Sequence, residues 1–245
     1  MCTLLLGVGV LGHGTLLIGA NRDEDPRRPS DPPIALSSHP PVAGGRDRVS
    51  GGTWLAVRGR DAVIAVLNRR ADPPDPPLRS RGLLALDVAV AEDPLRALHQ
   101  ATAGEAYGPW SLVHVDRSGG WVAQGGDAAG RGVTRVIPLA RGWHVLTHTQ
   151  LDDPAEPRAA WLAHELAHAR PRDPDAGLAL LARLLATHGG EGVPAVCLHG
   201  GRMPTRSSAR IWLGPDGARW WHAEGPPCMT PWQDVTSLLA AESAR

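Results

Sequence analysis

The 245-residue sequence contains no lysine and no phenylalanine, and it has only three cysteines. All 25 basic residues are therefore arginine, which excludes a lysine Schiff base and the phosphate-binding lysine of a P-loop. The cysteines, Cys2, Cys197 and Cys228, form no CxxC pair and are odd in number, so they do not indicate a disulfide framework. A reducing, cytoplasmic location is the expectation that follows.

An excess of charge of either sign is also missing, because 25 acidic residues balance the 25 basic ones. Such a chain gains little from counterion release, so the composition argues against a nucleic-acid partner. No apolar run has the length of a membrane span. The run at 3–20 is interrupted by Gly12-His13-Gly14 and no positive charge precedes it. It therefore predicts a β-hairpin, with a signal peptide as the alternative.

Glycine and proline are abundant, with 29 and 23 copies, and 42% of the residues are hydrophobic. This composition predicts one loop-rich globular domain over residues 1–245. Hydrophobic patterning and turn residues predict strands at 3–11, 15–20, 53–58, 62–67, 110–115, 120–123, 135–139, 143–147, 195–198, 209–213 and 218–222. Helices are predicted at 83–90, 94–101, 155–169 and 175–187, and proline-rich loops at 25–50 and 69–81. Strands at both ends with helices between them indicate the α+β class.

The beginning of the chain carries a candidate nucleophile, Cys2. Removal of Met1 would give Cys2 a free α-amine, which titrates near 8 and can accept the thiol proton at neutral pH. The segment Asn21-Arg22-Asp23-Glu24 ends the second predicted strand, so hairpin pairing places Asp23 near Cys2. The alternative interpretation is an ordinary strand residue and a solvated loop.

The sequence resembles a known family at these positions. Cys2-Thr3, Asn21-Arg22-Asp23-Glu24 and Gly51-Gly52-Thr53-Trp54 match the signature of the NRDE family, the transport-and-Golgi-organisation-2-like proteins. Pro204-Thr205-Arg206-Ser207-Ser208 is similar to that family's C-terminal motif, so the resemblance spans nearly the whole chain. The family is similar to the N-terminal-nucleophile hydrolases, including penicillin V acylase and bile salt hydrolase. The resemblance implies an αββα sandwich.

The same resemblance implies catalytic roles for five residues. Cys2 matches the nucleophile of the acylases, and Asp23 matches the aspartate that holds the α-amine. Asn68 and His148 match positions of oxyanion-hole donors, although the acylases carry asparagine where this chain has His148. Arg206 matches the late arginine near the nucleophile. Together with the α-ammonium, Arg206 is expected to lower the pKa of the Cys2 thiol.

Two functions follow from this set of residues. The first is a cysteine hydrolase that cleaves a non-peptide amide bond without a cofactor. The second is a non-catalytic carrier of haem, or of acyl-CoA or lipid, in the same cleft, because the family is implicated in such traffic. In both cases the partner is a small molecule, and the oligomeric state is not predicted. Three residues are expected to contact that ligand: Asn21, Arg22 and Trp54.

A competing motif is His164-Glu165-Leu166-Ala167-His168, which matches the HExxH pattern of zinc hydrolases. No third histidine follows at the metzincin spacing, and Pro171 and Pro174 end the helix soon after. We therefore interpret the segment as an exposed helix, predict no metal site, and keep a zinc hydrolase as a minor alternative. Cys197 is expected to be an inert buried thiol and Cys228 to lie on a loop.

Overall fold

The computed structural model describes residues 2–69, 78–126 and 130–239. The chain divides into two compact units, and neither is one continuous stretch of sequence. The first unit comprises Met1–Arg27 and Ala140–Ser237, and the second comprises Arg28–Leu139 and Leu238–Arg245. Each unit contains one antiparallel sheet and one pair of α-helices, so the α+β class is confirmed. A single domain over the whole chain stays a prediction.

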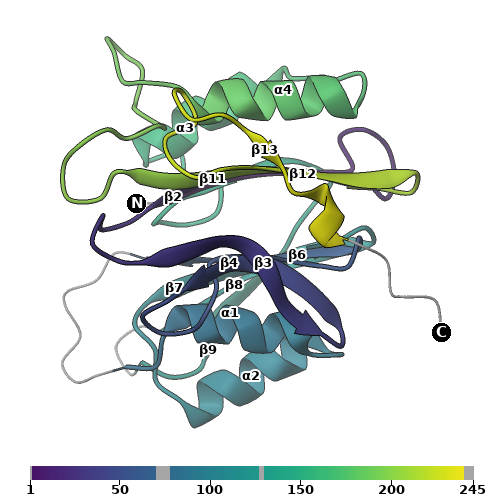
Figure 1. The fold of residues 1–245 in the computed structure, drawn as a ribbon, viewed down its shortest axis with the longest axis vertical. Helices are drawn as coiled ribbons and strands as arrows, with labels where there is room; N and C mark the ends of the chain where they lie inside the picture. The colour runs from purple at the N-terminus through teal and green to yellow at the C-terminus, as the bar shows by residue number, and fades with distance from the viewer. Residues whose placement is uncertain (1, 70–77, 127–129, 240–245) are drawn as a thin grey trace. The chain divides into compact units, whose positions relative to one another are not determined.

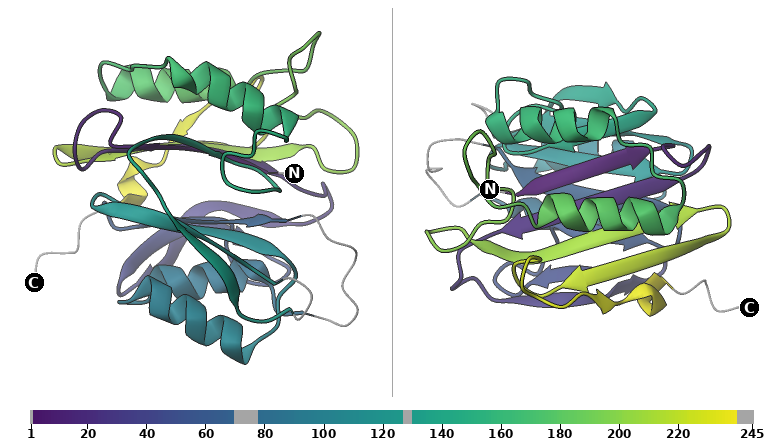
Figure 2. Two further views of the ribbon diagram at one scale, coloured as in Figure 1. Left: turned by 180° about the vertical axis from the view of Figure 1, so that it is seen from behind. Right: turned by 90° about the horizontal axis from the view of Figure 1, so that it is seen from above.

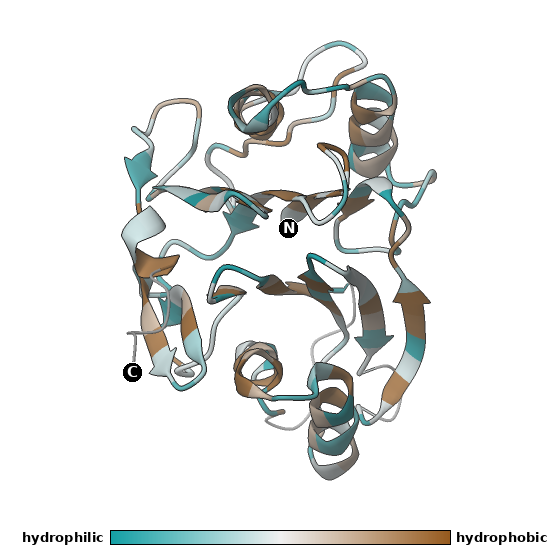
Figure 3. Cartoon of the chain, turned by 90° about the vertical axis from the view of Figure 1, so that its right-hand side faces the viewer, coloured by the Kyte–Doolittle hydropathy of each residue, from teal (hydrophilic) through white to brown (hydrophobic). Residues whose placement is uncertain are grey.

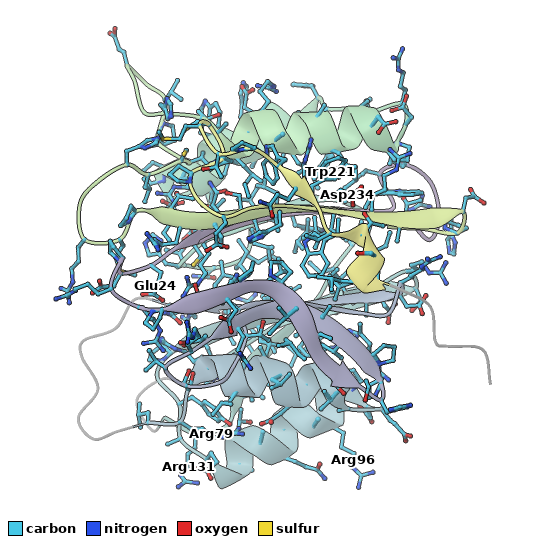
Figure 4. All side chains as sticks on the ribbon, in the orientation of Figure 1. Glu24, Arg79, Arg96, Arg131, Trp221 and Asp234 are labelled. Carbon is cyan, nitrogen blue, oxygen red and sulfur yellow. The ribbon has the colours of Figure 1, made fainter. Side chains whose placement is uncertain are left out.

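The first unit is built on a six-stranded sheet with the order β10-β1-β2-β11-β12-β13. Its strands are β1 (Thr3–Val8), β2 (Leu16–Asp23), β10 (Gly142–Leu146), β11 (Thr205–Gly214), β12 (Gly217–Ala223) and β13 (Gln233–Asp234). The predicted hairpin at the start of the chain is confirmed, with β1 and β2 paired antiparallel. Strands from the two ends of the sequence lie side by side where β2 pairs with β11 (Figure 2). The edge strand β13 joins β12 through the pair Trp221 and Asp234 (Figure 4).

Two helices, α3 (Pro157–Ala167) and α4 (Pro174–Leu185), lie on one face of this sheet (Figure 1). Each begins with a proline after an acidic N-cap: the Glu156 carboxylate accepts from the amide of Ala159, and Asp173 caps α4 in the same way. Hydrophobic positions recur along each helix (Figure 3) and pack on the odd-numbered residues of the central strands, such as Leu5 and Leu17. These contacts form the core of the unit.

The second unit is a seven-stranded sheet with the sequential order β3-β4-β5-β6-β7-β8-β9. Its strands are β3 (Ser30–Ser38), β4 (Pro41–Asp47), β5 (Leu55–Arg58), β6 (Ala62–Asn68), β7 (Trp110–Asp116), β8 (Gly119–Gly125) and β9 (Val133–Pro138). Helix α1 (Arg81–Val90) packs on β4, β5 and β6, and α2 (Pro94–Gly104) packs on α1. The longest described helix, α4, has 12 residues. No described helix is both long and apolar enough to cross a lipid bilayer.

The prediction of a loop at 25–50 is wrong, because most of this segment forms the β3–β4 hairpin. Proline has no amide N–H and is tolerated in a strand only where no ladder bond is needed. Pro32 and Pro33 lie in β3, which is the edge strand of its sheet, and its pairing contains two bulges. The strand predicted at 195–198 is also wrong, because this stretch is irregular. Most of the other predicted loop, 69–81, lies outside the described residues.

Candidate active site

One end of the sheet in the first unit brings together residues that are far apart in the sequence. In an antiparallel sheet the starts of β1 and β11 meet the ends of β2 and β10. At this end, Cys2 precedes β1, Asp23 ends β2, Thr205 begins β11 and His148 follows β10. Asp23 lies directly opposite Thr205 in the β2–β11 pairing. The hairpin predicted that Asp23 lies near Cys2, and the structure adds Thr205 and His148 at the same end of the sheet.

Cys2 is half-buried, and its thiol donates to the backbone carbonyl oxygen of Asp23 at a sulfur–oxygen distance of 3.8 Å. Burial, helped by the negative charge of Asp23, raises the pKa of the Cys2 thiol. In the chain that carries Met1, the loss of water around sulfur outweighs the nearby positive charges, including that of Arg22. The lowering expected from the α-ammonium of a processed Cys2 stays a prediction. A raised pKa favours the neutral thiol, whose nucleophilic attack requires a base.

The Asp23 carboxylate is 2% exposed and has polar support on both oxygens. Oδ1 accepts a hydrogen bond of 2.7 Å from the Thr205 hydroxyl. Oδ2 lies 3.6 Å from Nη1 of Arg158. Burial raises the pKa of Asp23, whereas the Thr205 hydrogen bond and the Arg158 charge lower it, and the net shift is upward. The carboxylate is thus fixed in position and poorly solvated.

Arg158 is a site residue that was not predicted from the sequence. It occupies the first turn of α3, and its Nη1 also donates to the Thr3 hydroxyl at 3.0 Å. Arg158 thereby links the start of β1 to Asp23 at the end of β2. The only sequence signal was the helix start at Glu156-Pro157, which follows the predicted strand at 143–147 within a short connection. That signal predicts a helix start near the sheet, but it does not predict that Arg158 contacts Asp23.

Asn21, expected to contact the ligand, makes three hydrogen bonds within the protein. Its Nδ2 donates to the carbonyl oxygens of Leu185 and Val196, at 2.9 and 3.0 Å. Its Oδ1 accepts from the Ser208 hydroxyl at 2.6 Å. The amide is 1% exposed, and its two N–H donors are both used. We therefore assign Asn21 a structural role: it ties the end of α4 and the stretch before β11 to β2.

Arg22 alternates with its neighbours along β2 and so points to the opposite face of the sheet. It is 5% exposed, and its Nη2 lies 3.7 Å from Oε2 of Glu24, the residue that follows β2 (Figure 4). The expected contact between Arg22 and a ligand stays a prediction.

Arg206 and His148 are both placed at this end of the sheet. Arg206 sits at a β-bulge of β11, between the pairs formed by Thr205 and Ser207. Its Nε is buried and has no hydrogen-bond partner within the described part of the chain. Arg158 forms an ion pair with Asp23. The expected effect of Arg206 on the pKa of the Cys2 thiol stays a prediction. His148 is 8% exposed and lies two residues beyond β10.

The remaining two expected residues, Asn68 and Trp54, belong to the second unit. Asn68 is the exposed last residue of β6, opposite Trp110. Trp54 is half-buried, and its indole occupies the space where a Cβ on Gly45 would lie. Their expected roles at the Cys2 site stay predictions.

The HExxH segment lies on α3, with His164 and His168 exposed and their ring centroids 6.4 Å apart. Helix α3 ends at Ala167, so His168 is its C-cap. The Glu165 carboxylate lies 3.5 Å from Nη1 of Arg183 on α4. These contacts fit the interpretation as an exposed helix with polar side chains.

Two solved enzyme structures were found to be similar to this chain. The Caenorhabditis elegans N-acylethanolamine-hydrolyzing acid amidase ortholog matches with a TM-score of 0.56 and 12% identity, over 85% of this chain and 92% of that chain. A variant of conjugated bile acid hydrolase from Clostridium perfringens matches with a TM-score of 0.49 and 11% identity, over 98% and 94%. The likeness to the amidase confirms a fold resembling that of the N-terminal-nucleophile hydrolases.

Sequence comparison identifies the family. The Transport and Golgi organization 2 homolog of Mus musculus is 29% identical over an alignment of 147 residues that covers 57% of this chain and 52% of that protein. The match thus spans about half the length of the mouse relative. The family described as Transport and Golgi organisation 2 matches residues 1–174, a region that includes Cys2, the NRDE segment and the GGTW segment. The chain belongs to the Transport and Golgi organisation 2 family.

Proposed function

We propose that this protein is an N-terminal cysteine hydrolase that cleaves a non-peptide amide bond after Met1 has been removed. The observation that carries the proposal is the buried Asp23 carboxylate, held by Thr205 and Arg158 at the end of β2, whose last carbonyl accepts from the Cys2 thiol. A fixed carboxylate in poor contact with water favours a neighbouring cation. The α-ammonium that forms when the amine of a processed Cys2 takes up the thiol proton is such a cation.

The raised pKa of the Cys2 thiol supports this mechanism, because a neutral thiol requires a base. In the proposed reaction, the thiol proton moves to the α-amine of Cys2 as Sγ attacks the amide carbonyl carbon. The C–N bond breaks, the departing amine takes that proton, and the acyl group stays on Sγ as a thioester. Water then attacks the thioester carbon with the α-amine as base, which releases a carboxylic acid and returns the proton to Sγ.

Asp23 acts in this scheme through the α-amine, so it is a positioning residue that favours the protonated amine. His148 is proposed as the donor to the oxyanion, because an imidazole N–H can supply the hydrogen bond that stabilises the tetrahedral intermediate. The participation of Asn68 in the same role stays a prediction.

The test is hydrolysis of a fatty-acyl ethanolamide, the substrate class after which the C. elegans amidase is named. Wild type, Cys2→Ala and Asp23→Asn are compared at equal concentration, and intact mass establishes the loss of Met1. Cys2→Ala is expected to show no hydrolysis, and Asp23→Asn to lose roughly 10²-fold or more in rate. Asp25→Asn is the matched control, because Asp25 bonds to its exposed neighbour Arg27.

Equal rates for wild type and Cys2→Ala would overturn the proposal, as would a purified protein that retains Met1 and still hydrolyses the amide. Carriage of haem, acyl-CoA or lipid stays a prediction. A carrier would bind its ligand with Met1 in place and without turnover, so the same preparations distinguish the two functions.

A further inference from the structure

Four side chains with metal-binding atoms converge in the irregular segments of the first unit. The group consists of His188, Cys197, His199 and Cys228, and one potential ligand atom from each lies within 4.8 Å of all the others. Nε2 of His199 lies 3.1 Å from Nε2 of His188 and 3.1 Å from Sγ of Cys228. Sγ of Cys197 lies 3.6 Å from both His199 Nε2 and Cys228 Sγ.

Four of the six separations are close to the edges of a tetrahedron around one zinc ion, and the other two are no longer than 4.8 Å. With Zn–S near 2.3 Å and Zn–N near 2.0–2.1 Å, tetrahedral ligand atoms are roughly 3.3 Å apart for N–N, 3.6 Å for N–S and 3.8 Å for S–S. The observed distances are 3.1 Å for N–N, 3.1 and 3.6 Å for N–S, and 3.6 Å for S–S. Each agrees with the tetrahedral value to within about 0.5 Å.

Hydrogen bonding does not explain the same arrangement. A neutral imidazole Nε2 carries either one proton or one lone pair, so it forms one good hydrogen bond. Nε2 of His199 has three close neighbours instead, two of which are sulfur atoms. Four nitrogen and sulfur atoms gathered this closely form a ligand set that a cation can hold together.

The surrounding chain holds these ligands from several directions. His188 follows α4, and Cys197 and His199 lie in the irregular stretch before β11. Cys228 is exposed in the segment between β12 and β13. Cys197, expected from the sequence to be an inert buried thiol, is 2% exposed.

We propose that His188, Cys197, His199 and Cys228 bind one structural Zn²⁺ ion. Two thiolates and two imidazoles are the ligand set of closed zinc sites, and they disfavour Mg²⁺ and Ca²⁺, which prefer oxygen. With all four positions supplied by protein, no position is open for a reacting water. The ion would join the stretch before β11 to the segment after β12.

This site also adjoins the candidate active site through the backbone. The amide of Leu198, between two ligands, donates to the Thr205 hydroxyl at 2.9 Å. That hydroxyl in turn donates to Asp23. Zinc would thus hold the stretch that positions Thr205. The zinc proposal does not depend on the proposed hydrolase activity, because zinc would hold the stretch before β11 in place whatever reaction the protein catalyses.

The experiment measures zinc in the full chain, purified without a histidine tag and without chelator. We expect about one zinc per chain in wild type and a roughly tenfold loss in Cys228→Ser and in His188→Ala. His164→Ala and His168→Ala are the matched controls, since both histidines are exposed on α3, and they are expected to retain zinc. Far-UV circular dichroism confirms that each variant is folded.

A second measurement replaces zinc by Co²⁺ in the reduced, metal-stripped protein. Wild type is expected to show a thiolate-to-cobalt charge-transfer band, which Cys228→Ser weakens or loses. Chelation is expected to lower the Tm of wild type and to leave that of Cys228→Ser unchanged. The proposal is overturned if the reduced wild type takes up neither Zn²⁺ nor Co²⁺. The proposal is also overturned if the purified protein contains a Cys197–Cys228 disulfide and binds no metal after that disulfide is reduced.

Discussion

Burial and hydrogen bonding act in opposite directions on the carboxyl group of Asp23. Burial is the larger effect, so the pKa of Asp23 lies above its ordinary value of 3.8. A carboxyl group with a raised folded pKa binds its proton more tightly in the folded chain than in the unfolded one. Its contribution to stability is complete below pH 3.8 and is lost as the pH rises through the folded pKa.

The first prediction is that Asp23→Asn removes this loss. As the pH rises above 3.8, the wild-type free energy of unfolding should fall by a contribution from Asp23 that is missing from the variant. Urea unfolding at several pH values measures it. Asp216→Asn, in the exposed turn between β11 and β12, is the control and should follow wild type. Parallel pH profiles for wild type and Asp23→Asn would contradict the prediction.

Arg158 is the cation that offsets the buried charge of Asp23. Arg158→Ala removes both the ion pair with Asp23 and the hydrogen bond to Thr3. We predict a fall of about 2 kcal/mol in the free energy of unfolding near pH 7, because a buried carboxylate loses its partner. Urea unfolding provides the measurement, and Arg172→Ala, with an 89% exposed side chain, is the control. An equal effect of the two substitutions would show that the ion pair contributes nothing.

At the level of elements, local patterns predicted most of the fold. The hairpin of β1 and β2 followed from two apolar runs around glycines, and α2 followed from an aspartate before a proline. Helix α4 begins one residue before its predicted start, because Asp173 caps it and Pro174 is its first residue. The β3–β4 hairpin could not be predicted, because only the edge position of β3 makes its prolines acceptable. The pairing of Asp23 with Arg158 could not be predicted either, because it joins residues 135 positions apart that share no motif.

The GGTW segment has a packing role at this scale. A Cβ on Gly52 would lie 2.2 Å from the carbonyl carbon of Gly82 and 2.4 Å from the amide nitrogen of Leu83. The amide of Thr53 donates to the Gly82 carbonyl at 3.0 Å. The first turn of α1 therefore rests directly on the backbone of this segment, at a distance that only glycine allows.

We predict that Gly52→Ala lowers the free energy of unfolding by about 2–3 kcal/mol, because backbone must move away from backbone. Thermal unfolding followed by circular dichroism measures the change. Gly104→Ala at the end of α2 is the control, since no atom lies within 4 Å of its added Cβ. A Tm for Gly52→Ala equal to that of the control would refute the packing argument.

At the scale of the whole molecule, the two units differ in how they use the chain. The second unit is nearly one continuous stretch, whereas the sheet of the first unit inserts β1 and β2 between β10 and β11. The proposed zinc site could not be predicted from the sequence, because it depends on the tertiary fold. His188, Cys197 and Cys228 have no common spacing motif.

The last prediction concerns fragments. Residues 28–139 contain all the strands of their sheet, so this fragment is expected to retain far-UV circular dichroism typical of β-structure. Residues 140–239 lack the interior strands β1 and β2, which separate β10 from β11, so this fragment is expected to show no cooperative unfolding. Adding a peptide of residues 1–27 tests whether the missing strands restore it. A cooperative transition in residues 140–239 alone would contradict the prediction.

The central position of β1 and β2 has a consequence during synthesis. This hairpin leaves the ribosome before both of its neighbours in the sheet, since β10 begins about 120 residues after β2 ends and β11 about 180 residues after it. At 5–20 residues per second these delays are roughly 6 to 24 s and 10 to 40 s. Until β10 emerges, two strands rich in leucine have unpaired backbone on both outer edges, which is the condition for association with other nascent chains. The newborn protein is therefore most exposed to aggregation before its second half exists, and holding chaperones would act on its first 27 residues.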